Sequence, residues 1–396
     1  MELITTTQAL SAACQELARH PFVTVDTEFL RDTTFWPKLC LIQMASPEGT
    51  LSLVDPLAGD IDLEPFFELM RNEAVLKVFH AARQDIEIVY NLSGSVPHPV
   101  FDTQVAAAVC GFGESVSYDQ LVRKVKKVEI DKSHRFTDWS RRPLTDKQLR
   151  YAAADVIHLI EPYQHLAEML EKNGRSQWIA EEMEILTSPD TYRLAPEDAW
   201  KRLKMRARKP RELEALKRLA EWRESEAQTR DVPRGRIIKD DVIYEVCTQL
   251  PDNAAALGHI RALPRGFERS KQGEAILEIV KGVKALEDKD LPRMPRSERR
   301  PQAHPAVTDL LKVLLKQVSE DEGVASRMIA TADEIEQIAG DDKADVPALS
   351  GWRRDIYGEL ALRLKRGEIA LAVEGPKLVR VERDVPQKRE KAAASR

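Results

Sequence analysis

The first hundred residues alternate between short apolar runs and longer amphipathic segments. Five runs are rich in apolar and β-branched side chains and have the length of strands: 22–25, 39–45, 50–54, 76–79 and 100–102. The turn-forming sequence Ser46-Pro47-Glu48-Gly49 separates the second run from the third. We therefore predict that these two runs form a hairpin.

Helical periodicity appears between the predicted strands. Apolar side chains recur at helical spacing in three segments: 7–19, 63–72 and 84–92. Three consecutive strands followed by alternating strands and helices indicate an α/β domain with a mixed sheet flanked by helices.

Beyond residue 103 the pattern becomes helical, and no strong strand signal returns. The clearest predicted helices are 104–110, 118–125, 146–173, 176–186, 211–229, 310–318 and 352–365. Composition then suggests a division into a first domain, a basic linker, a helical domain, a Pro/Arg-rich linker, a second helical domain and a disordered basic tail. The corresponding ranges are 1–190, 191–209, 210–288, 289–304, 305–375 and 376–396.

Length and composition exclude several classes of protein. The chain has 396 residues, of which 43% are hydrophobic and 32% charged, so collagen-like, disulfide-scaffold and wholly disordered chains are excluded. Its four cysteines form no CxxC pair, which argues against a zinc ribbon. No apolar run is long enough to cross a bilayer, and the N-terminus lacks the features of a secretory signal, so we expect a cytoplasmic protein without membrane contact.

The charge is unevenly distributed along the chain. The formal net charge is −5, yet residues 201–211 contain seven basic side chains and no acidic one. This density suits a polyanionic partner, although a solvated linker also has this composition. The run alone leaves both interpretations open.

Two acidic residues follow the first predicted strand at strand spacing. Residues two apart on a strand point to the same side, so Asp26 and Glu28 should project together from the strand end. Two carboxylates this close repel each other unless a cation lies between them, and hard cations such as Mg²⁺ prefer oxygen ligands. The pair is therefore a candidate half of a metal site, or an ordinary solvated turn.

Two further features add chemistry to this pair. Asp85 follows the fourth predicted strand and opens a helix, where a carboxylate also complements the helix dipole. Tyr151 and Asp155 are four residues apart in a predicted helix, which places both on one face. A two-metal phosphoryl site requires about four carboxylates and a group that orients water, and these five residues would supply both.

Together with several longer motifs, these residues resemble the DEDD superfamily of 3′-to-5′ exonucleases, in its tyrosine subgroup, and specifically the ribonuclease D family. The motifs that support this resemblance are 26–29 leading to 41–45, 101–104 before a helix, and 138–144 running into 151–155. The match covers roughly residues 1–178. Residues 210–285 resemble the helical HRDC domain shared by RecQ-type helicases and ribonuclease D, and residues 305–375 resemble a diverged second copy.

The resemblance implies a fold, a metal site and a reaction. The fold would be ribonuclease-H-like and followed by two all-α domains. Asp26, Glu28, Asp85 and Asp155 would bind two divalent ions, Mg²⁺ or Mn²⁺, and Tyr151 would position the attacking water. His80 could be mistaken for a general base, but the position four residues before Asp155 holds a tyrosine, so we interpret His80 as a supporting residue.

Several residues near these motifs are candidate contacts to RNA. Phe29 adjoins Glu28 and could stack on a terminal base. His80 lies at a predicted strand end beside the site. A basic stretch before the Tyr151 helix could contact phosphates or only cover a surface; its members are Lys132, His134, Arg135, Arg141 and Arg142.

The resemblance favours a cytoplasmic, metal-dependent exoribonuclease that trims the 3′ ends of structured RNA such as tRNA precursors and releases nucleoside 5′-monophosphates. The helical domains would bind or align the RNA, and no obligate protein partner is inferred. One alternative is a DNA 3′-5′ exonuclease with the same site, and another is a non-catalytic RNA-binding protein. A helicase-type motor lacks support because the chain contains no GxxxxGK[ST] phosphate loop.

Overall fold

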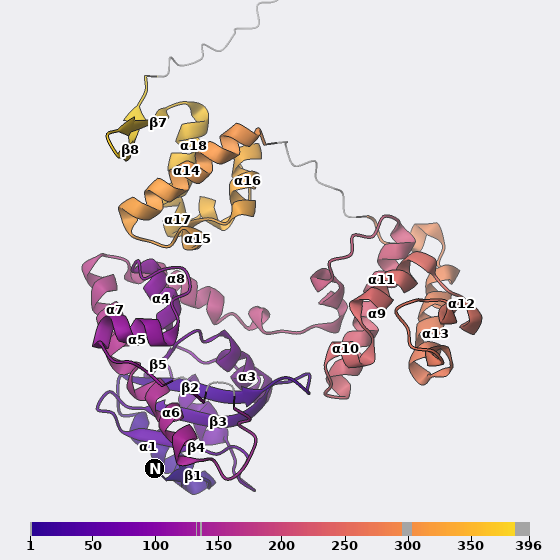
Figure 1. The fold of residues 1–396 in the computed structure, drawn as a ribbon, viewed down its shortest axis with the longest axis horizontal. Coiled ribbons are helices and arrows are strands. Elements are labelled where there is room, and N and C mark those ends of the chain that lie inside the picture. Colours follow the sequence, from indigo (N-terminus) through magenta and orange to yellow (C-terminus); the bar gives the residue numbers. More distant parts are fainter. Residues whose placement is uncertain (1, 132, 135–136, 295–302, 385–396) are drawn as a thin grey trace, which may run out of the picture. The chain divides into compact units, whose positions relative to one another are not determined.

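The computed structural model describes residues 2–131, 133–134, 137–294 and 303–384 (Figure 1). The chain divides into two compact units. Unit 1 comprises Met1–Asp102, Ile130–Ile160 and Met183–Arg296. Unit 2 comprises Thr103–Glu129, Glu161–Glu182 and Ser297–Arg396. The predicted first domain, 1–190, therefore contributes segments to both units.

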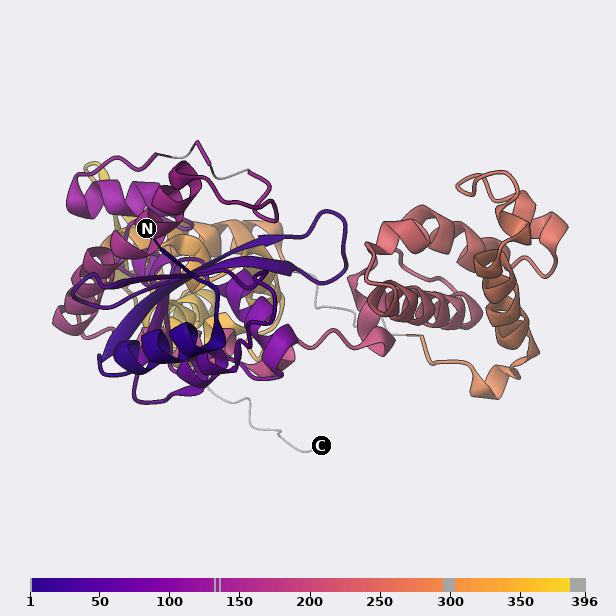
Figure 2. The ribbon, with the colours of Figure 1, turned by 90° about the horizontal axis from the view of Figure 1, so that it is seen from below.

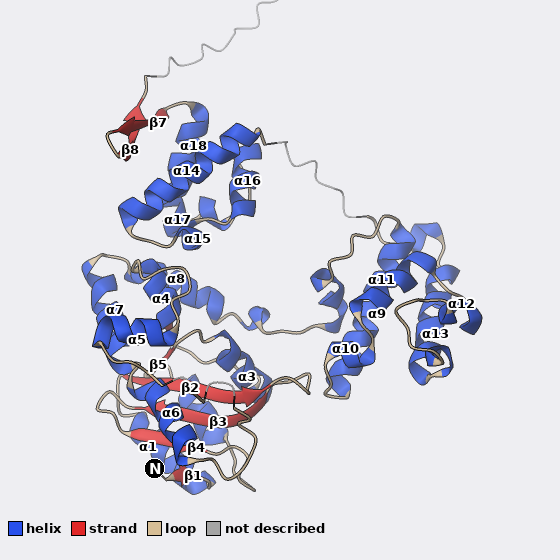
Figure 3. Cartoon of the chain, in the orientation of Figure 1, coloured by secondary structure: helices blue, strands red, loops and turns tan. Residues whose placement is uncertain are grey.

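A six-stranded mixed sheet lies in unit 1 (Figure 3). Its strands are β1 (Leu3–Ile4), β2 (Phe22–Leu30), β3 (Lys38–Ala45), β4 (Leu51–Val54), β5 (Leu76–Phe79) and β6 (Val100–Asp102). The order is β1-β4-β3-β2-β5-β6, with β3 antiparallel to both neighbours and the other pairs parallel. The predicted mixed sheet and the β3–β4 hairpin are confirmed. The two-residue strand β1 is too short to give a periodic signal, and its pairing with β4 defines it.

Strand β2 is longer than predicted and runs past the acidic pair. Its partner β3 continues beside it to Leu30, whereas β5 pairs with β2 only over Phe22–Thr24. The connection between β2 and β3 extends beyond the sheet (Figure 2). Asp26 and Glu28 therefore lie within β2 and not at its end, in the part of the strand that β5 no longer accompanies.

Four helices of unit 1 accompany the sheet. They are α1 (Thr7–Leu17), α2 (Glu64–Arg71), α3 (Arg83–Ser93) and α6 (Asp146–Ile157). The hydroxyl of Thr6 accepts a hydrogen bond from the backbone N–H of Ala9 and caps α1. Helix α6 packs against β2, β3 and β4. It begins with a capping box in which Thr145 and Gln148 satisfy each other's backbone N–H groups.

The prediction of a single helix over 146–173 is wrong, because the chain forms two helices in this range. Helix α6 ends at Ile157 and α7 (Ile160–Lys172) follows it. Pro162 explains the break, since a proline ring clashes with the carbonyl four residues earlier, here that of His158. Asp155 consequently lies in the last turn of α6.

A second, all-helical part of unit 1 follows the sheet. It contains α9 (Pro210–Thr229), α10 (Arg234–Ile237), α11 (Asp240–Gln249), α12 (Ala254–Gly258) and α13 (Lys271–Ala285). Leu216, Ile243 and Val280 are fully buried in its core. The predicted linker 191–209 is partly folded onto this core: it contains a 3₁₀ helix at Pro196–Arg202, and it packs Trp200, Leu203 and Met205 against the core.

Unit 2 combines helices from the middle and the end of the chain. They are α4 (Thr103–Val109), α5 (Tyr118–Lys126), α7, the part of α8 (Ser176–Leu186) up to Glu182, α14 (Pro305–Glu322), α15 (Ser326–Ile329), α16 (Ala332–Gly340), α17 (Gly351–Arg353) and α18 (Glu359–Arg366). The indole rings of Trp178 and Trp352 stack with centroids 4.6 Å apart, and Nε1 of Trp352 donates to Glu182 over 3.2 Å. This contact joins α8 to the C-terminal helices.

The C-terminal region differs from the prediction of helix to residue 375 and disorder beyond it. Strands β7 (Ile369–Glu374) and β8 (Lys377–Glu382) form an antiparallel hairpin (Figure 3). Nε2 of Gln317 in α14 donates to the carbonyl of Leu378 over 2.9 Å, which ties the hairpin to the helices. Residues 385–396 of the predicted tail and 295–302 of the predicted second linker lie outside the described residues.

Within the described part of the chain, no helix is both long and apolar enough to cross a bilayer.

Candidate active site

The first two acidic residues project from the same face of β2. Asp26 pairs in register with Gln43 of β3, and Glu28 with Leu41. The register shifts after Glu28, because Phe29 pairs with Leu39 and Cys40 is left over as a bulge. The antiparallel ladder thus fixes Asp26 and Glu28 side by side at a point where the sheet bends.

A buried hydroxyl brings the third carboxylate to this face. Oγ1 of Thr24, two residues before Asp26, donates to the carbonyl of Val156 in α6 over 3.0 Å. Ala152 and Ala153 are buried, and their small side chains let α6 approach the sheet closely. Asp155 adjoins Val156, so the Thr24 contact holds the end of α6 beside Asp26.

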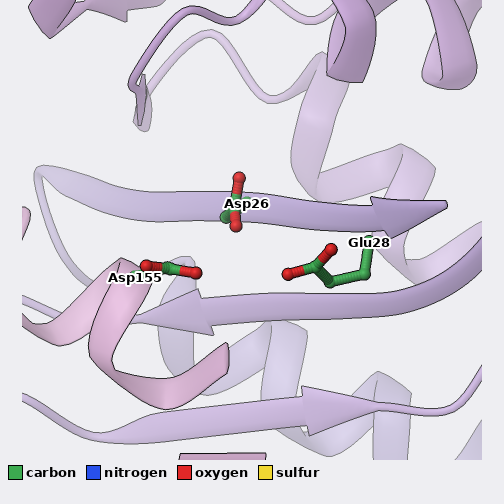
Figure 4. Close-up of side chains that lie close together, drawn as sticks. All are labelled: Asp26, Glu28 and Asp155. Atoms are coloured by element: carbon green, nitrogen blue, oxygen red, sulfur yellow. The ribbon is translucent and has the colours of Figure 1, made fainter. Parts of the chain in front are cut away.

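Asp26, Glu28 and Asp155 form a compact acidic cluster. Each offers a carboxylate oxygen, and these oxygens lie within 4.8 Å of one another. Figure 4 shows the carboxylate of Glu28 turned along the strand toward Asp155, with Asp26 between them. Oxygen ligands at this spacing are suited to a hard divalent cation.

Asp85 reaches the cluster from the N-terminal turn of α3. It is 6% exposed, and its Oδ1 accepts a hydrogen bond from Oγ1 of Thr27 over 2.5 Å. Thr27 lies between Asp26 and Glu28 on β2, so this bond joins the fourth carboxylate to the strand that carries the first two. Asp85 therefore lies beside the strand of the acidic cluster, and its charge contributes to the raised pKa of Glu28.

The turn that presents Asp85 is held by another acid. Oδ1 and Oδ2 of Asp102, at the end of β6, accept hydrogen bonds from the backbone N–H groups of Ala81 and Ala82 over 3.0 and 2.8 Å. Ala81 has a φ of 61°, a left-handed conformation that costs energy for a residue with a Cβ. The two bonds offset that cost and fix the start of α3.

Burial and mutual repulsion shift the acidities of these carboxyl groups. Burial, and then the charge of Asp155, raise the pKa of Asp26. Burial and the charges of Asp26, Asp155 and Asp85 raise the pKa of Glu28. Burial and the charge of Asp26 also raise the pKa of Asp85, against the lowering effect of the Thr27 hydrogen bond. A cation among these groups would remove the repulsion that their ionisation creates.

Tyr151 lies one helical turn before Asp155 in α6. It is half-buried, and its ring centroid lies 6.0 Å from that of the buried Trp139 at an angle of 36°. Trp139 therefore limits where the phenol can point. Tyr151 and Asp155 come from the same face of α6, as their spacing predicts.

Comparison with known proteins assigns the chain to a family. A model of the 3′-5′ exonuclease family matches residues 1–171, and one of the HRDC domain matches 212–280. Ribonuclease D of Nitrobacter hamburgensis is 54% identical over 97% of this chain and 100% of that protein. The chain belongs to the ribonuclease D family. Ribonuclease D of Bartonella henselae is 45% identical over 96% of this chain and 93% of that protein.

A solved structure agrees with the ribonuclease D assignment. Escherichia coli RNase D, described as an exoribonuclease involved in structured RNA processing, superposes with a TM-score of 0.81 at 29% identity. The match covers 92% of this chain and 98% of that one. The predicted family, fold class and first HRDC domain are confirmed, and the chain is a hydrolytic 3′-to-5′ exoribonuclease.

The residues predicted to contact RNA differ in their surroundings. Phe29 and His80 are half-buried, and both adjoin the site in sequence, after Glu28 and after β5 respectively. The side chain of Arg141 is 83% exposed and pairs with Asp138 over 3.1 Å. Lys132 and Arg135 lie outside the described residues.

Arg142 has a structural role that contradicts the predicted RNA contact. Its Nε and Nη2 donate to the two carboxylate oxygens of Asp55 over 2.6 and 2.5 Å. The guanidinium also donates to the carbonyls of Cys40, Trp139 and Arg141 over 2.7, 2.8 and 2.9 Å. These bonds use all five donors of the guanidinium, so none remains for a phosphate.

Sequence reasoning assigned no role to three residues that shape this ribonuclease D site. Thr27 and Asp102 stood only inside longer motifs, and their contacts to Asp85 and to its turn depend on the tertiary structure. Gln43 is fully buried opposite Asp26, and neither atom of its amide has a hydrogen-bond partner in the described structure. A buried polar side chain inside an otherwise apolar strand was the available signal for Gln43.

Proposed function

We propose that Asp26, Glu28, Asp85 and Asp155 hold two divalent ions, Mg²⁺ or Mn²⁺, and that the enzyme removes nucleoside 5′-monophosphates one at a time from RNA 3′ ends. The observation that carries the proposal is the acidic cluster, whose three oxygens lie within 4.8 Å of one another. The raised pKa values of Asp26 and Glu28 support it, because burial and the neighbouring carboxylates disfavour the ionised forms that a bound cation would stabilise.

The chemistry of the donor set fits such ions. Every donor is a carboxylate oxygen, and Mg²⁺ and Mn²⁺ prefer oxygen ligands. When bound, two such ions lower the pKa of water and stabilise the charge on the leaving 3′ oxygen.

The protein's own residues would position the reactants. A tyrosine hydroxyl can both donate and accept a hydrogen bond, so that of Tyr151 can orient the attacking water. The packing of its ring against Trp139 limits its rotation. Thr27 would hold Asp85 in the orientation needed for binding, through the 2.5 Å bond to Oδ1.

The substrate would be structured RNA with a 3′ extension, such as a tRNA precursor. The similarity to Escherichia coli RNase D, which is involved in structured RNA processing, supports this class of substrate. In this proposal residues 1–190 are the nuclease domain, and the helical domains 210–288 and 305–375 align the RNA. The enzyme would act in the cytoplasm without an obligate protein partner.

Cleavage of a tRNA precursor labelled at its 5′ end tests this function. With Mg²⁺ or Mn²⁺ we expect a ladder that shortens by single nucleotides from the 3′ end and that is absent in EDTA. Asp155→Asn should abolish the ladder, and Tyr151→Phe should slow it by about 10²-fold or more, the usual contribution of a group that assists proton transfer. Internal cuts, or activity that survives in Asp155→Asn, would show that the site is misassigned.

Matched RNA and DNA oligonucleotides separate the exoribonuclease from a DNA exonuclease with the same site. The 2′-hydroxyl distinguishes the two substrates. We expect faster shortening of the RNA strand. Equal or faster cleavage of DNA would contradict the proposed substrate, and RNA binding without metal-dependent cleavage would indicate a non-catalytic binding protein.

A further inference from the structure

Arg142 fastens the segment that precedes α6 to two strands of the sheet. Its guanidinium binds both carboxylate oxygens of Asp55, the residue after β4, over 2.6 and 2.5 Å. It also donates to the carbonyl of Cys40, the bulge residue of β3, over 2.7 Å. Within its own segment it donates to the carbonyl of Trp139 over 2.8 Å. One planar group therefore joins the backbone at Trp139 to β3 and to the end of β4.

The carboxylate that Arg142 binds is itself fixed. The side chain of Asp55 is 8% exposed, and its Oδ1 accepts a hydrogen bond from the backbone N–H of Leu57 over 2.9 Å. The backbone N–H of Asp55 donates to the carbonyl of Ile4 in β1 over 2.9 Å. A bidentate pair with a planar guanidinium fixes orientation as well as distance. The sheet therefore sets where the guanidinium lies.

Trp139 depends on this backbone contact for its place. The residue is 2% exposed and belongs to an apolar cluster with Leu41 of β3 and with Leu149 and Ala152 of α6. A buried indole usually donates a hydrogen bond, but Nε1 of Trp139 has no partner among the described residues. Packing and the backbone that Arg142 holds thus determine the position of the ring.

The ring of Trp139 lies against the tyrosine of the active site. Its centroid is 6.0 Å from that of the half-buried Tyr151, which packs against the same apolar cluster. The terminal side-chain torsion of a tyrosine has a broad energy minimum, so the neighbours of the ring decide where the phenol oxygen lies. A displacement of about 1 Å in a reacting group can cost on the order of 10² in rate. A shift of Trp139 would therefore reach the phenol.

We propose that Arg142 is a positioning residue of the reaction: it holds Trp139 against Tyr151 and so fixes the phenol that orients the attacking water. This inference rests on the proposed function, which gives the phenol that role. Arg142 contacts neither the RNA nor the ions in this arrangement. Its replacement should therefore change kcat and leave both KM and the Mg²⁺ requirement as they are.

The test is a double-mutant cycle in the full-length protein with Arg142→Lys and Tyr151→Phe. Lysine keeps a positive charge beside Asp55, but its ammonium cannot reproduce the planar fork of five donors. The control is Arg175→Lys in unit 2, where the guanidinium likewise donates to backbone carbonyls, those of Val109 and Glu322, over 3.1 and 2.7 Å. Shortening of an RNA labelled at its 5′ end is measured over a range of RNA and Mg²⁺ concentrations, together with the unfolding temperature of each variant.

We expect Arg142→Lys to lower kcat about tenfold, with an unchanged KM and an unchanged Mg²⁺ concentration for half-maximal rate. In the Tyr151→Phe background the same substitution should lower kcat by less than about twofold, because the hydroxyl that it positions is already gone. Arg175→Lys should keep the kcat of the wild type, even where its unfolding temperature falls as far as that of Arg142→Lys.

Three results would overturn this inference alone: a wild-type kcat in Arg142→Lys, a tenfold effect that persists in the Tyr151→Phe background, or a raised Mg²⁺ requirement. The last result would show that Arg142 acts on the metal site through the bulge at Cys40. A Tyr151→Phe variant with the kcat of the wild type would instead refute the role of the phenol in the proposed function, and the inference would fall with it.

Discussion

The hydroxyl of Thr27 donates a hydrogen bond to Oδ1 of Asp85 over 2.5 Å. This bond connects β2 to the first turn of α3, and Thr27 stands between the two acidic residues of β2. Strand β2 thus carries the carboxylates of Asp26 and Glu28 on one side. Thr27, which lies between them in sequence, orients the carboxylate of Asp85. The proposed metal site depends on this bond as well as on its acidic residues.

Replacing Thr27 tests this dependence. Thr27→Val keeps the shape of the side chain but removes the donor, so Asp85 loses its fixed orientation. We expect kcat/KM to fall by about 10- to 100-fold, the usual cost of removing a partner that orients a metal ligand, and the Mg²⁺ concentration for half-maximal rate to rise. Thr27→Ser retains the hydroxyl and should stay close to wild type; equal losses in the two variants would contradict an orienting role.

The acidic cluster should make the metal-free protein less stable as the pH rises. The raised pKa values mean that the native state holds protons which the unfolded chain releases above about pH 4, so stability falls with increasing pH. Asp155→Asn removes one charge and relieves this effect. In EDTA we expect the variant to unfold at a higher temperature than the wild type, by a margin that grows from pH 5.5 to pH 8.5.

Added Mg²⁺ provides the complementary measurement. Because the ligands must be deprotonated, Mg²⁺ should raise the unfolding temperature of the wild type more at pH 8.5 than at pH 5.5. It should raise that of Asp155→Asn much less at either pH. A stabilisation by Mg²⁺ that is equal in the two proteins would place the bound ion elsewhere.

Arg141 and Arg142 are neighbours in sequence, but we expect their replacement to change the free energy of unfolding by very different amounts. Arg142→Ala leaves Asp55, whose side chain is 8% exposed, without its partner, and we expect the free energy of unfolding to fall by about 2 kcal/mol. Arg141→Ala removes only an exposed ion pair and should change it by less than about 0.5 kcal/mol. Urea unfolding of both variants measures this difference, and similar values would show that the Asp55 contacts contribute little.

Lys77 is fully buried in β5 and stabilises the nuclease by linking backbone groups. Its Nζ donates to the carbonyls of Asn72, Val75 and His98 over 2.8, 2.8 and 2.5 Å. Lys77→Met would leave these acceptors unsatisfied, so we expect a loss of about 3 kcal/mol in the free energy of unfolding. The exposed Lys38→Met on β3 is the control and should be near neutral. A loss below about 1 kcal/mol for Lys77→Met would indicate that water replaces the ammonium.

The acidic site could be predicted because its residues lie in local patterns. Asp26 and Glu28 are two apart on a strand, and Tyr151 and Asp155 are four apart on a helix, so the backbone period alone sets their common faces. The apolar runs likewise predicted five of the six strands of the sheet, since a buried strand must be apolar. The resemblance of these motifs to the ribonuclease D family then joined the separate pieces into one site.

Long-range contacts decided the rest. The pairing of β2 with β3 extends the strand through Asp26 and Glu28, and the bond from Thr24 to Val156 fixes Asp155 beside them. Arg142 stands in a basic stretch, yet its five donors are all used within the protein. Sequence determined which side chains can carry charge or bind an ion. Only the tertiary structure decided which charges are already neutralised by a distant partner, because a hydrogen bond or ion pair depends on distance in space and not on separation along the chain.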